Sequence, residues 1–285
     1  MNTSVLDVDV PCHATRATDP PALEHLSWSS ASTYCQCPKK FELQKLLRVE
    51  PTFVPAALVF GQSVHQAIEA VQESRLQGVV LPAVKQLMDV YMVAWKSNTT
   101  TVPTVQYAKD EDELSLRTLA ERMLTAYRQH VAESVDDGAV VYAIEHEARF
   151  KLHPLLPDIV ARIDLIEMRG NNLVLTDYKT SRGKWNDSKA NASENLGQLM
   201  IYAYAARPLL KELGADRLVP RFVILSKLKT TTIQIVEPTA TQADAQRVKD
   251  QFLEVYSAIR AGIFVPRTGW HCSQCPFKSR CPAFS

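Results

Sequence analysis

Two aspartates and a lysine lie on neighbouring segments of extended pattern in the middle of the chain. Asp164 falls in ARIDLI, and Asp177 and Lys179 fall in LVLTDYK, with the turn RGNN between the two segments. If the hairpin is centred between Gly170 and Asn171, the numbers of paired residues sum to 341. Asp164 then lies opposite Asp177, with Cβ atoms about 5 Å apart. Lys179 is two residues beyond Asp177 and therefore shares its face of the sheet.

Two carboxylates and an ammonium group that converge within an apolar hairpin suit a divalent cation. Oxygen ligands favour Mg²⁺ or Mn²⁺, and a nearby lysine can orient or deprotonate the attacking water. This chemistry is hydrolysis of a phosphodiester bond. The alternative is that Asp164 and Asp177 are solvated on an exposed sheet face, with Lys179 neutralising one of them. Helical segments on both sides of the hairpin favour a buried position, where carboxylates need a partner.

Three further side chains on predicted helices add to the hairpin. Gln198 and Tyr202 are four residues apart, so they project from one face of the helix expected over 194–213. His65 lies on an earlier helix expected over 61–76 and offers a nitrogen ligand. A single histidine on an amphipathic helix is more often packed or solvated than a ligand, so the weight of His65 depends on the other groups.

The cysteines gather near the two ends of the chain. Cys272, Cys275 and Cys281 follow a C-x2-C-x5-C spacing, which is typical of metal ligands in a short segment. Three thiolates leave a four-ligand site one short, and Cys35 or Cys37 from the other end supplies the fourth. Zinc and a [4Fe–4S] cluster both accept four thiolates, and the spacing does not distinguish them. Structural cysteines without a metal are the remaining alternative.

The elements that position these groups follow from the periodicity of the sequence. Besides 61–76, the expected helices are 82–97, 110–135, 194–213 and 241–261, and the expected strands are 140–151, 158–168, 172–179, 220–227 and 231–237. This order predicts an α/β fold with a mixed sheet flanked by helices and a helical insertion at about 75–135. We predict a loose arm over residues 1–25 and a single domain over 26–285. Within this domain, the segment 270–285 is expected to pack against 34–41.

Composition and charge exclude other classes of protein. The chain has 285 residues, 46% of them hydrophobic and 22% charged, which is ordinary for a soluble domain. No apolar run approaches the roughly 18 residues that span a bilayer, and no secretory signal is visible, so a cytoplasmic location is expected. The net charge of +1 means that DNA must meet a local basic surface. Arg182 and Lys184 offer one after Lys179, with Trp185 as a stacking platform.

Together these motifs resemble the RecB-like branch of the PD-(D/E)XK nucleases. They resemble more narrowly its iron–sulfur members, the AddB nuclease domain and the nuclease used in CRISPR adaptation. The resemblance runs in order from about Ser27 to Cys281. It rests on GQSVHQAIEA around His65, ARIDLI, DYKTS, Q-x3-Y, Y-x2-C-P and C-x2-C-x5-C. The chain departs from the family at Ala161, where the family often has glycine.

The resemblance implies a restriction-endonuclease-like core and assigns roles at the hairpin. Asp164 and Asp177 bind metal together with His65 and the backbone carbonyl of Tyr178, and Lys179 positions the attacking water.

Other parts of the chain receive roles from the same resemblance. Gln198 and Tyr202 lie by the site, where they contact DNA or support Lys179. The Tyr-x-x-Cys-Pro pattern makes Cys37 the fourth ligand of a [4Fe–4S] cluster. Glu147 also fits a family position, without a clear role.

The expected function is therefore a metal-dependent DNA exonuclease acting on DNA ends or single strands. Its setting is DNA repair, recombination or CRISPR-type processing, with a helicase or a CRISPR integrase as partner and no membrane. One alternative is a non-catalytic DNA-binding or recruitment subunit, against which the intact Asp/Asp/Lys set argues. A redox sensor built on the cysteines is another, and it leaves the acidic hairpin unexplained.

Overall fold

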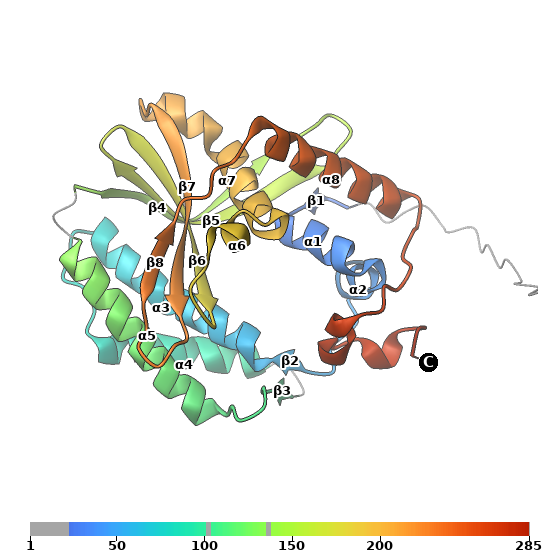
Figure 1. Cartoon of the computed structure of the whole chain (residues 1–285), viewed down its shortest axis with the longest axis horizontal. Coiled ribbons are helices and arrows are strands. Elements are labelled where there is room, and N and C mark those ends of the chain that lie inside the picture. The colour runs from blue at the N-terminus through green and yellow to red at the C-terminus, as the bar shows by residue number, and fades with distance from the viewer. Residues whose placement is uncertain (1–22, 101–103, 135–137, 285) are drawn as a thin grey trace, which may run out of the picture.

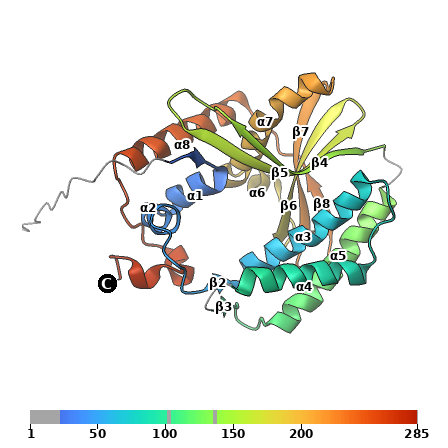
Figure 2. The same ribbon diagram turned by 180° about the vertical axis from the view of Figure 1, so that it is seen from behind.

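A central sheet between two layers of helices organises the computed structural model, which describes residues 23–100, 104–134 and 138–284 (Figure 1). The mixed α/β architecture is thereby confirmed. One face of the sheet carries the helices α3 (Ala56–Leu76), α4 (Val84–Thr100) and α5 (Glu113–Glu133). The other face carries α1 (Trp28–Gln36), α7 (Ser193–Glu212) and α8 (Gln242–Arg260). Figure 2 shows the same two layers from behind.

Within the described residues the sheet has six strands in the order β1-β5-β6-β7-β8, with β4 paired to β5. Their bounds are β1 His25–Leu26, β4 Val140–Phe150, β5 Asp158–Arg169, β6 Asn172–Ser181, β7 Arg217–Ser226 and β8 Ile233–Val236. Strands β4, β5 and β6 are antiparallel, whereas β7 runs parallel to β6 after the α7 crossover. A separate two-stranded sheet joins β2 (Val54–Pro55) and β3 (Val105–Gln106).

The hairpin of β5 and β6 has the predicted register. Leu165 pairs with Thr176, and Arg169 pairs with Asn172, as the sum of 341 requires. The paired residues of β5 and β6 end at Leu165 and Thr176, so the two strands part where Asp164 and Asp177 follow. This separation opens the space between the two carboxylates.

Alternating side chains of the strands divide the core into two clusters. Phe222 and Ile224 of β7 pack with α1, α7 and α8, while Val223 and Leu225 pack with α3, α4 and α5. Helices α4 and α5, which fall in the predicted insertion at about 75–135, therefore pack with α3 and share one apolar core with the sheet. Helix α3, which precedes the predicted insertion, begins at Ala56, earlier than the predicted residue 61, because Phe60 continues the buried stripe and is fully buried.

The C-terminal segment of the described chain lies beside residues 35–52, near the other end of the chain. The C-terminal segment, with the short helices η3 (Trp270–Gln274) and η4 (Lys278–Arg280), lies near α2 (Pro38–Phe41) in both views. The Thr52 N–H donates to the carbonyl of Pro276 at 3.1 Å, and the Arg267 guanidinium donates to the carbonyl of Cys35 at 2.7 Å. The remaining short helices are η1 (Glu42–Leu46) and α6 (Asp187–Ala190).

At the N-terminal end, His25 pairs with Asp158 in the sheet, so the arm predicted over 1–25 ends before that residue. Residues 1–22 lie outside the described residues. None of the helices in the described ranges is both long and apolar enough to cross a membrane.

Candidate active site

Side chains from four elements meet where β5 and β6 part. They are His65 from α3, Asp164 from β5, Asp177 and Lys179 from β6, and Gln198 and Tyr202 from α7. Asp177 and Lys179 share one face of β6, as alternation predicts, and Tyr178 between them packs among α3 and α5 on the other.

Asp177 and Lys179 form the centre of this group. Asp177 is 1% exposed, and its Oδ2 lies 2.7 Å from the Lys179 Nζ. This contact is an ion pair, and Oδ2 makes no hydrogen bond of good geometry. The Lys179 Nζ also donates to the Oε1 of Gln198 at 2.9 Å. The amine is therefore held between a carboxylate and an amide.

Tyr202 ties both aspartates to α7. Its hydroxyl donates to Oδ1 of Asp177 at 3.1 Å and lies 3.5 Å from Oδ1 of Asp164. The Nε2 of Gln198 donates to the same hydroxyl at 3.1 Å. The predicted i, i+4 pair of α7 thus faces the hairpin, with one residue on the lysine and the other on the carboxylates.

His65 and the backbone of Tyr178 complete the group. The His65 Nε2 lies 2.6 Å from the Tyr178 carbonyl oxygen, and its Nδ1 lies 3.7 Å from Oδ2 of Asp164. The Tyr178 N–H donates to that same Oδ2 at 2.8 Å. Burial lowers the pKa of His65, although Asp177 acts in the opposite direction, so the neutral imidazole that a metal requires is favoured.

The charge state of Asp164 indicates whether a cation would be stabilised between the two aspartates. Burial, followed by repulsion from Asp177, raises the pKa of Asp164 from 3.8 to about 8. Two ionised carboxylates here are therefore unfavourable without added positive charge, and oxygen donors of this kind match Mg²⁺ or Mn²⁺. As the side chains stand, no group of three or more His, Cys, Asp or Glu in the described ranges is arranged to hold a metal ion. At the hairpin the Lys179 amine makes the close cationic contact instead.

Glu145 is a carboxylate that the sequence analysis missed. It stands between Ile144 and His146, which pair with Leu165 and Ile163, and this register sets it opposite Asp164. Its backbone has a φ of 47°, and burial together with Asp164 raises its pKa to about 7.

Glu147, the acidic residue expected from the resemblance, is bound elsewhere. It pairs with Arg162, whose Nη2 donates to its Oε2 at 3.2 Å. Which of Glu145 and Glu147 lies beside Asp164 depends on the register of β4 on β5. The sequence does not reveal this register, because the conformation of the loop that connects the two strands is not known from sequence.

Stability of the metal-free protein should fall as the pH rises. The unfolded chain loses the Asp164 proton near the ordinary pKa of 3.8, whereas the folded protein keeps it up to about 8. Between these values folding binds a proton, so the free energy of unfolding decreases with increasing pH. Urea unfolding in chelator at pH 5 and pH 8 measures this difference. Asp164→Asn should reduce it, and an identical pH dependence in variant and parent would contradict the assignment.

The basic residues after β6 divide into exposed and buried ones. Arg182 and Lys184 are exposed, as a DNA contact requires. The prediction of Trp185 as a stacking platform is wrong, because the side chain is only 8% exposed. Its Nε1 donates to the Ser181 Oγ at 3.0 Å, and its ring lies 5.1 Å from that of Phe222. The Trp185 ring is part of the apolar core, so its face is not available to stack on a base.

Four cysteines from the two ends line one cavity. They are Cys37, Cys272, Cys275 and Cys281. Cys35 lies outside this set, and its sulfur accepts a hydrogen bond from Gln251 at 3.4 Å. Burial raises the pKa of the Cys275 thiol, so metal binding there must release a proton. The donor chemistry suits a metal, although the thiols do not stand in ligating geometry.

The family model described as the PD-(D/E)XK nuclease superfamily matches residues 25–282. No curated protein matches the chain.

Solved structures are similar in fold. A presumed exonuclease from Eubacterium rectale aligns with a TM-score of 0.54 at 12% identity, covering 88% of this chain and 87% of that chain. The structure of SSO0001 aligns with a TM-score of 0.34 at 14% identity, covering 87% and 96%. At such identities the first likeness shows the fold alone, and nothing further follows from the second.

Proposed function

The chain belongs to the PD-(D/E)XK nuclease superfamily, and we propose from this premise that it is a deoxyribonuclease dependent on Mg²⁺ or Mn²⁺. The observation that carries the proposal is the contact of Asp177 with Lys179 at 2.7 Å, together with the Tyr202 hydroxyl that lies within 3.5 Å of both aspartates. This arrangement supports a shared role for the two aspartates and the lysine. The complete set of Asp164, Asp177 and Lys179 argues against a binding protein that has given up catalysis.

The metal in this proposal is held by Asp164, Asp177, His65 and the carbonyl oxygen of Tyr178. When bound, the ion supplies Lewis-acid stabilisation of the phosphate charge and makes water more acidic. The hydrogen bond from the Tyr178 N–H keeps Asp164 turned toward the gap between the strands.

The protein's own groups supply the remaining steps. Lys179 orients the attacking water, and its amine is aimed by the Gln198 oxygen at 2.9 Å. Tyr202 holds the Asp177 carboxylate in place while the phosphate approaches. We assign these roles to Lys179, Gln198 and Tyr202 as catalytic residues, and the initial DNA contact to the exposed Arg182 and Lys184.

The finer proposal is an exonuclease that acts on DNA ends or single strands, on the RecB-like iron–sulfur branch of the superfamily. The motif resemblance supports it, as does the shared cavity of the four cysteines. In this proposal Cys37, Cys272, Cys275 and Cys281 bind a [4Fe–4S] cluster, with zinc as the alternative. A DNA repair, recombination or CRISPR setting, with a helicase or an integrase as partner, belongs to the same proposal.

Linear and circular single-stranded DNA, incubated with protein and Mn²⁺, test the activity. We expect loss of the linear strand, survival of the circle, and full inhibition by EDTA. Linear strands blocked at the 5′ or the 3′ end then give the polarity. DNA that is bound but never cut would instead indicate a recruitment subunit, and cleavage that persists in EDTA would contradict the metal dependence.

Replacing Cys275 by serine should destabilise the protein and release its metal. Loss of a link between the chain ends is expected to cost about 2–5 kcal/mol, which lowers the melting temperature by roughly 3–8 °C in a domain of this size. Differential scanning calorimetry and metal analysis of anaerobically purified protein measure both effects.

Cys35→Ser is the matched control, because Cys35 lies outside the cavity and should leave melting and metal content unchanged. Visible absorbance of the parent distinguishes an iron–sulfur cluster from zinc. A Cys275→Ser protein with the parent's melting temperature and metal content would contradict a metal site that joins the two ends.

A further inference from the structure

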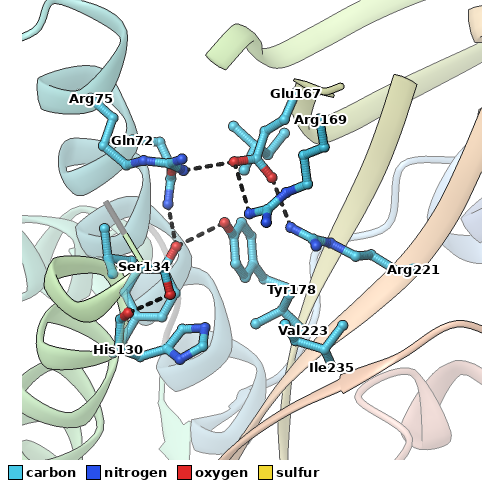
Figure 3. A pocket seen from close by; sticks show the side chains of 13 residues that line it. Gln72, Arg75, His130, Ser134, Glu167, Arg169, Tyr178, Arg221, Val223 and Ile235 are labelled. Carbon is cyan, nitrogen blue, oxygen red and sulfur yellow. Dashed lines mark hydrogen bonds and ion pairs between the residues drawn. The ribbon is translucent and has the colours of Figure 1, made fainter. Parts of the chain in front are cut away.

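On the face of strand β6 that Tyr178 occupies, opposite Asp177, buried polar side chains surround a small cavity (Figure 3). Gln72 and Arg75 enter it from α3, Tyr127 from α5 and Tyr178 from β6. Gln72, Tyr127 and Tyr178 are 1%, 2% and 4% exposed. Buried polar groups require partners, so their hydrogen bonds constrain where these elements lie.

A single chain of hydrogen bonds runs through the cavity. The Arg75 Nη1 donates to the Gln72 Oε1 at 2.6 Å, and the Gln72 Nε2 donates to the Tyr127 hydroxyl. The Tyr127 hydroxyl donates in turn to the Tyr178 hydroxyl at 2.8 Å. Because arginine only donates, it fixes the orientation of the Gln72 amide. That orientation directs the Tyr127 proton toward Tyr178.

Glu167 secures the far end of this chain. Its Oε1 lies 2.9 Å from the Arg75 Nη1, and its Oε2 lies 2.7 Å from the Arg221 Nη2. The Arg221 Nε donates to the Thr176 Oγ1 at 2.9 Å. Figure 3 shows Arg75 and Arg221 approaching Glu167 from opposite sides. Helix α3 is thereby tied to strands β5, β6 and β7.

Tyr178 belongs to this network and to the candidate active site at once. Its side chain receives the Tyr127 hydrogen bond, while its N–H binds Asp164 at 2.8 Å and its carbonyl meets His65 at 2.6 Å. His65 and Gln72 are seven residues apart on α3, two turns along the same face. Helix α3 therefore contacts Tyr178 directly at the backbone and, through Tyr127, at the side chain.

We propose that Tyr127, backed by Gln72, is a positioning residue for the metal-binding groups of the site. Its hydrogen bond holds the Tyr178 side chain and thereby sets the place of the Tyr178 carbonyl and of the N–H that orients Asp164. The inference rests on the proposed metal-dependent function. It adds a role for a residue that touches neither the phosphate nor the metal.

Two hydroxyl deletions test the proposal, Tyr127→Phe and Tyr178→Phe, together with the double variant. Loss of an outer hydrogen bond at a metal site typically costs about 10- to 100-fold in metal affinity or activity. Tyr127 acts one step further out, through the Tyr178 side chain, so we expect a reduction near the lower end of this range, about 10-fold, in the Mn²⁺ affinity of each single variant. Titration calorimetry well below the melting temperature measures it. The double variant should be no worse than Tyr127→Phe alone, because that change already deletes the bond that Tyr178→Phe removes.

Tyr91→Phe is the matched control. Tyr91 is a buried tyrosine of the same helical layer, 1% exposed, and packs against Phe60 and Trp95 without lining the cavity that holds Tyr127 and Tyr178. Its loss of a hydroxyl should leave the Mn²⁺ affinity unchanged. A merely structural role of Tyr127 would lower the melting temperature and leave the affinity of the folded protein intact.

Cleavage and metal binding separate this proposal from the proposed function. If the parent binds Mn²⁺ and never cuts DNA, the nuclease function fails, and the calorimetric comparison still decides the role of Tyr127. Equal Mn²⁺ affinities of parent and Tyr127→Phe would overturn the positioning role, as would additive losses in the double variant.

Discussion

Replacing Lys179 by alanine is expected to lower the rate of DNA cleavage by about 10²- to 10⁴-fold, the usual contribution of a positioned proton-transfer group. The structure gives the amine two partners, Asp177 of β6 at 2.7 Å and Gln198 of α7 at 2.9 Å, so its position is fixed beside the Asp177 carboxylate. Single-turnover cleavage of a labelled strand at saturating Mn²⁺ measures the chemical step. The loss should appear in kcat, because Lys179 is not proposed to bind the metal.

Two further variants sharpen this test. Lys179→Arg keeps the charge and loses the compact amine, so it should restore little activity even though the ion pair with Asp177 survives. Lys211→Ala removes an exposed lysine from α7, the helix that carries Gln198, and should leave the rate unchanged. Parent-like cleavage by Lys179→Ala would remove this residue from the chemistry and shift the site elsewhere.

Local patterns predicted the chemistry-bearing hairpin well. The register of β5 on β6 follows from one short turn, because the turn and the two alternating runs admit few pairings. The i, i+4 spacing of Gln198 and Tyr202 likewise requires only that α7 is a helix. These features need no knowledge of the rest of the chain, and the structure has them as predicted.

Features that depend on distant pairing were not predictable in the same way. Glu145 reaches Asp164 only through the register of β4, which a loop of unknown conformation sets. Trp185 follows three polar or flexible residues that suggest an exposed loop, yet its ring is covered by Phe222 of β7. In the sequence, Tyr127 is one of several apolar positions on a predicted helix. Its hydroxyl meets that of Tyr178 only because α5 packs against β6.

The ion pairs of Glu167 also depend on pairing between distant segments, and they were the least predictable from the sequence. Glu167 and Arg221 are 54 residues apart and read from the sequence as ordinary polar positions on half-exposed strands. In the structure Glu167 is fully buried and Arg221 is 6% exposed. Burial lowers the pKa of Arg221, and the neighbouring Glu167 carboxylate acts against that shift. The two charges are therefore compatible with the interior only as partners.

Glu167→Gln should accordingly destabilise the protein by about 3–5 kcal/mol, the usual cost of removing one partner from a buried ion pair. Glutamine keeps the size of the side chain and leaves Arg75 and Arg221 without the anion that both contact. Urea denaturation of the metal-free protein, followed by circular dichroism, gives the free energy of unfolding.

Glu147→Gln is the control that isolates burial from charge. Glu147 also faces an arginine, with 3.2 Å between its Oε2 and the Arg162 Nη2, but the two side chains are 52% and 63% exposed. An exposed pair contributes about 0–1 kcal/mol, so this variant should unfold almost like the parent. Equal losses in the two variants would mean that Glu167 stabilises the fold no more than a surface charge. The hydrogen-bond chain from Arg75 to Tyr178 would then lack the anchor on which the positioning of Asp164 depends.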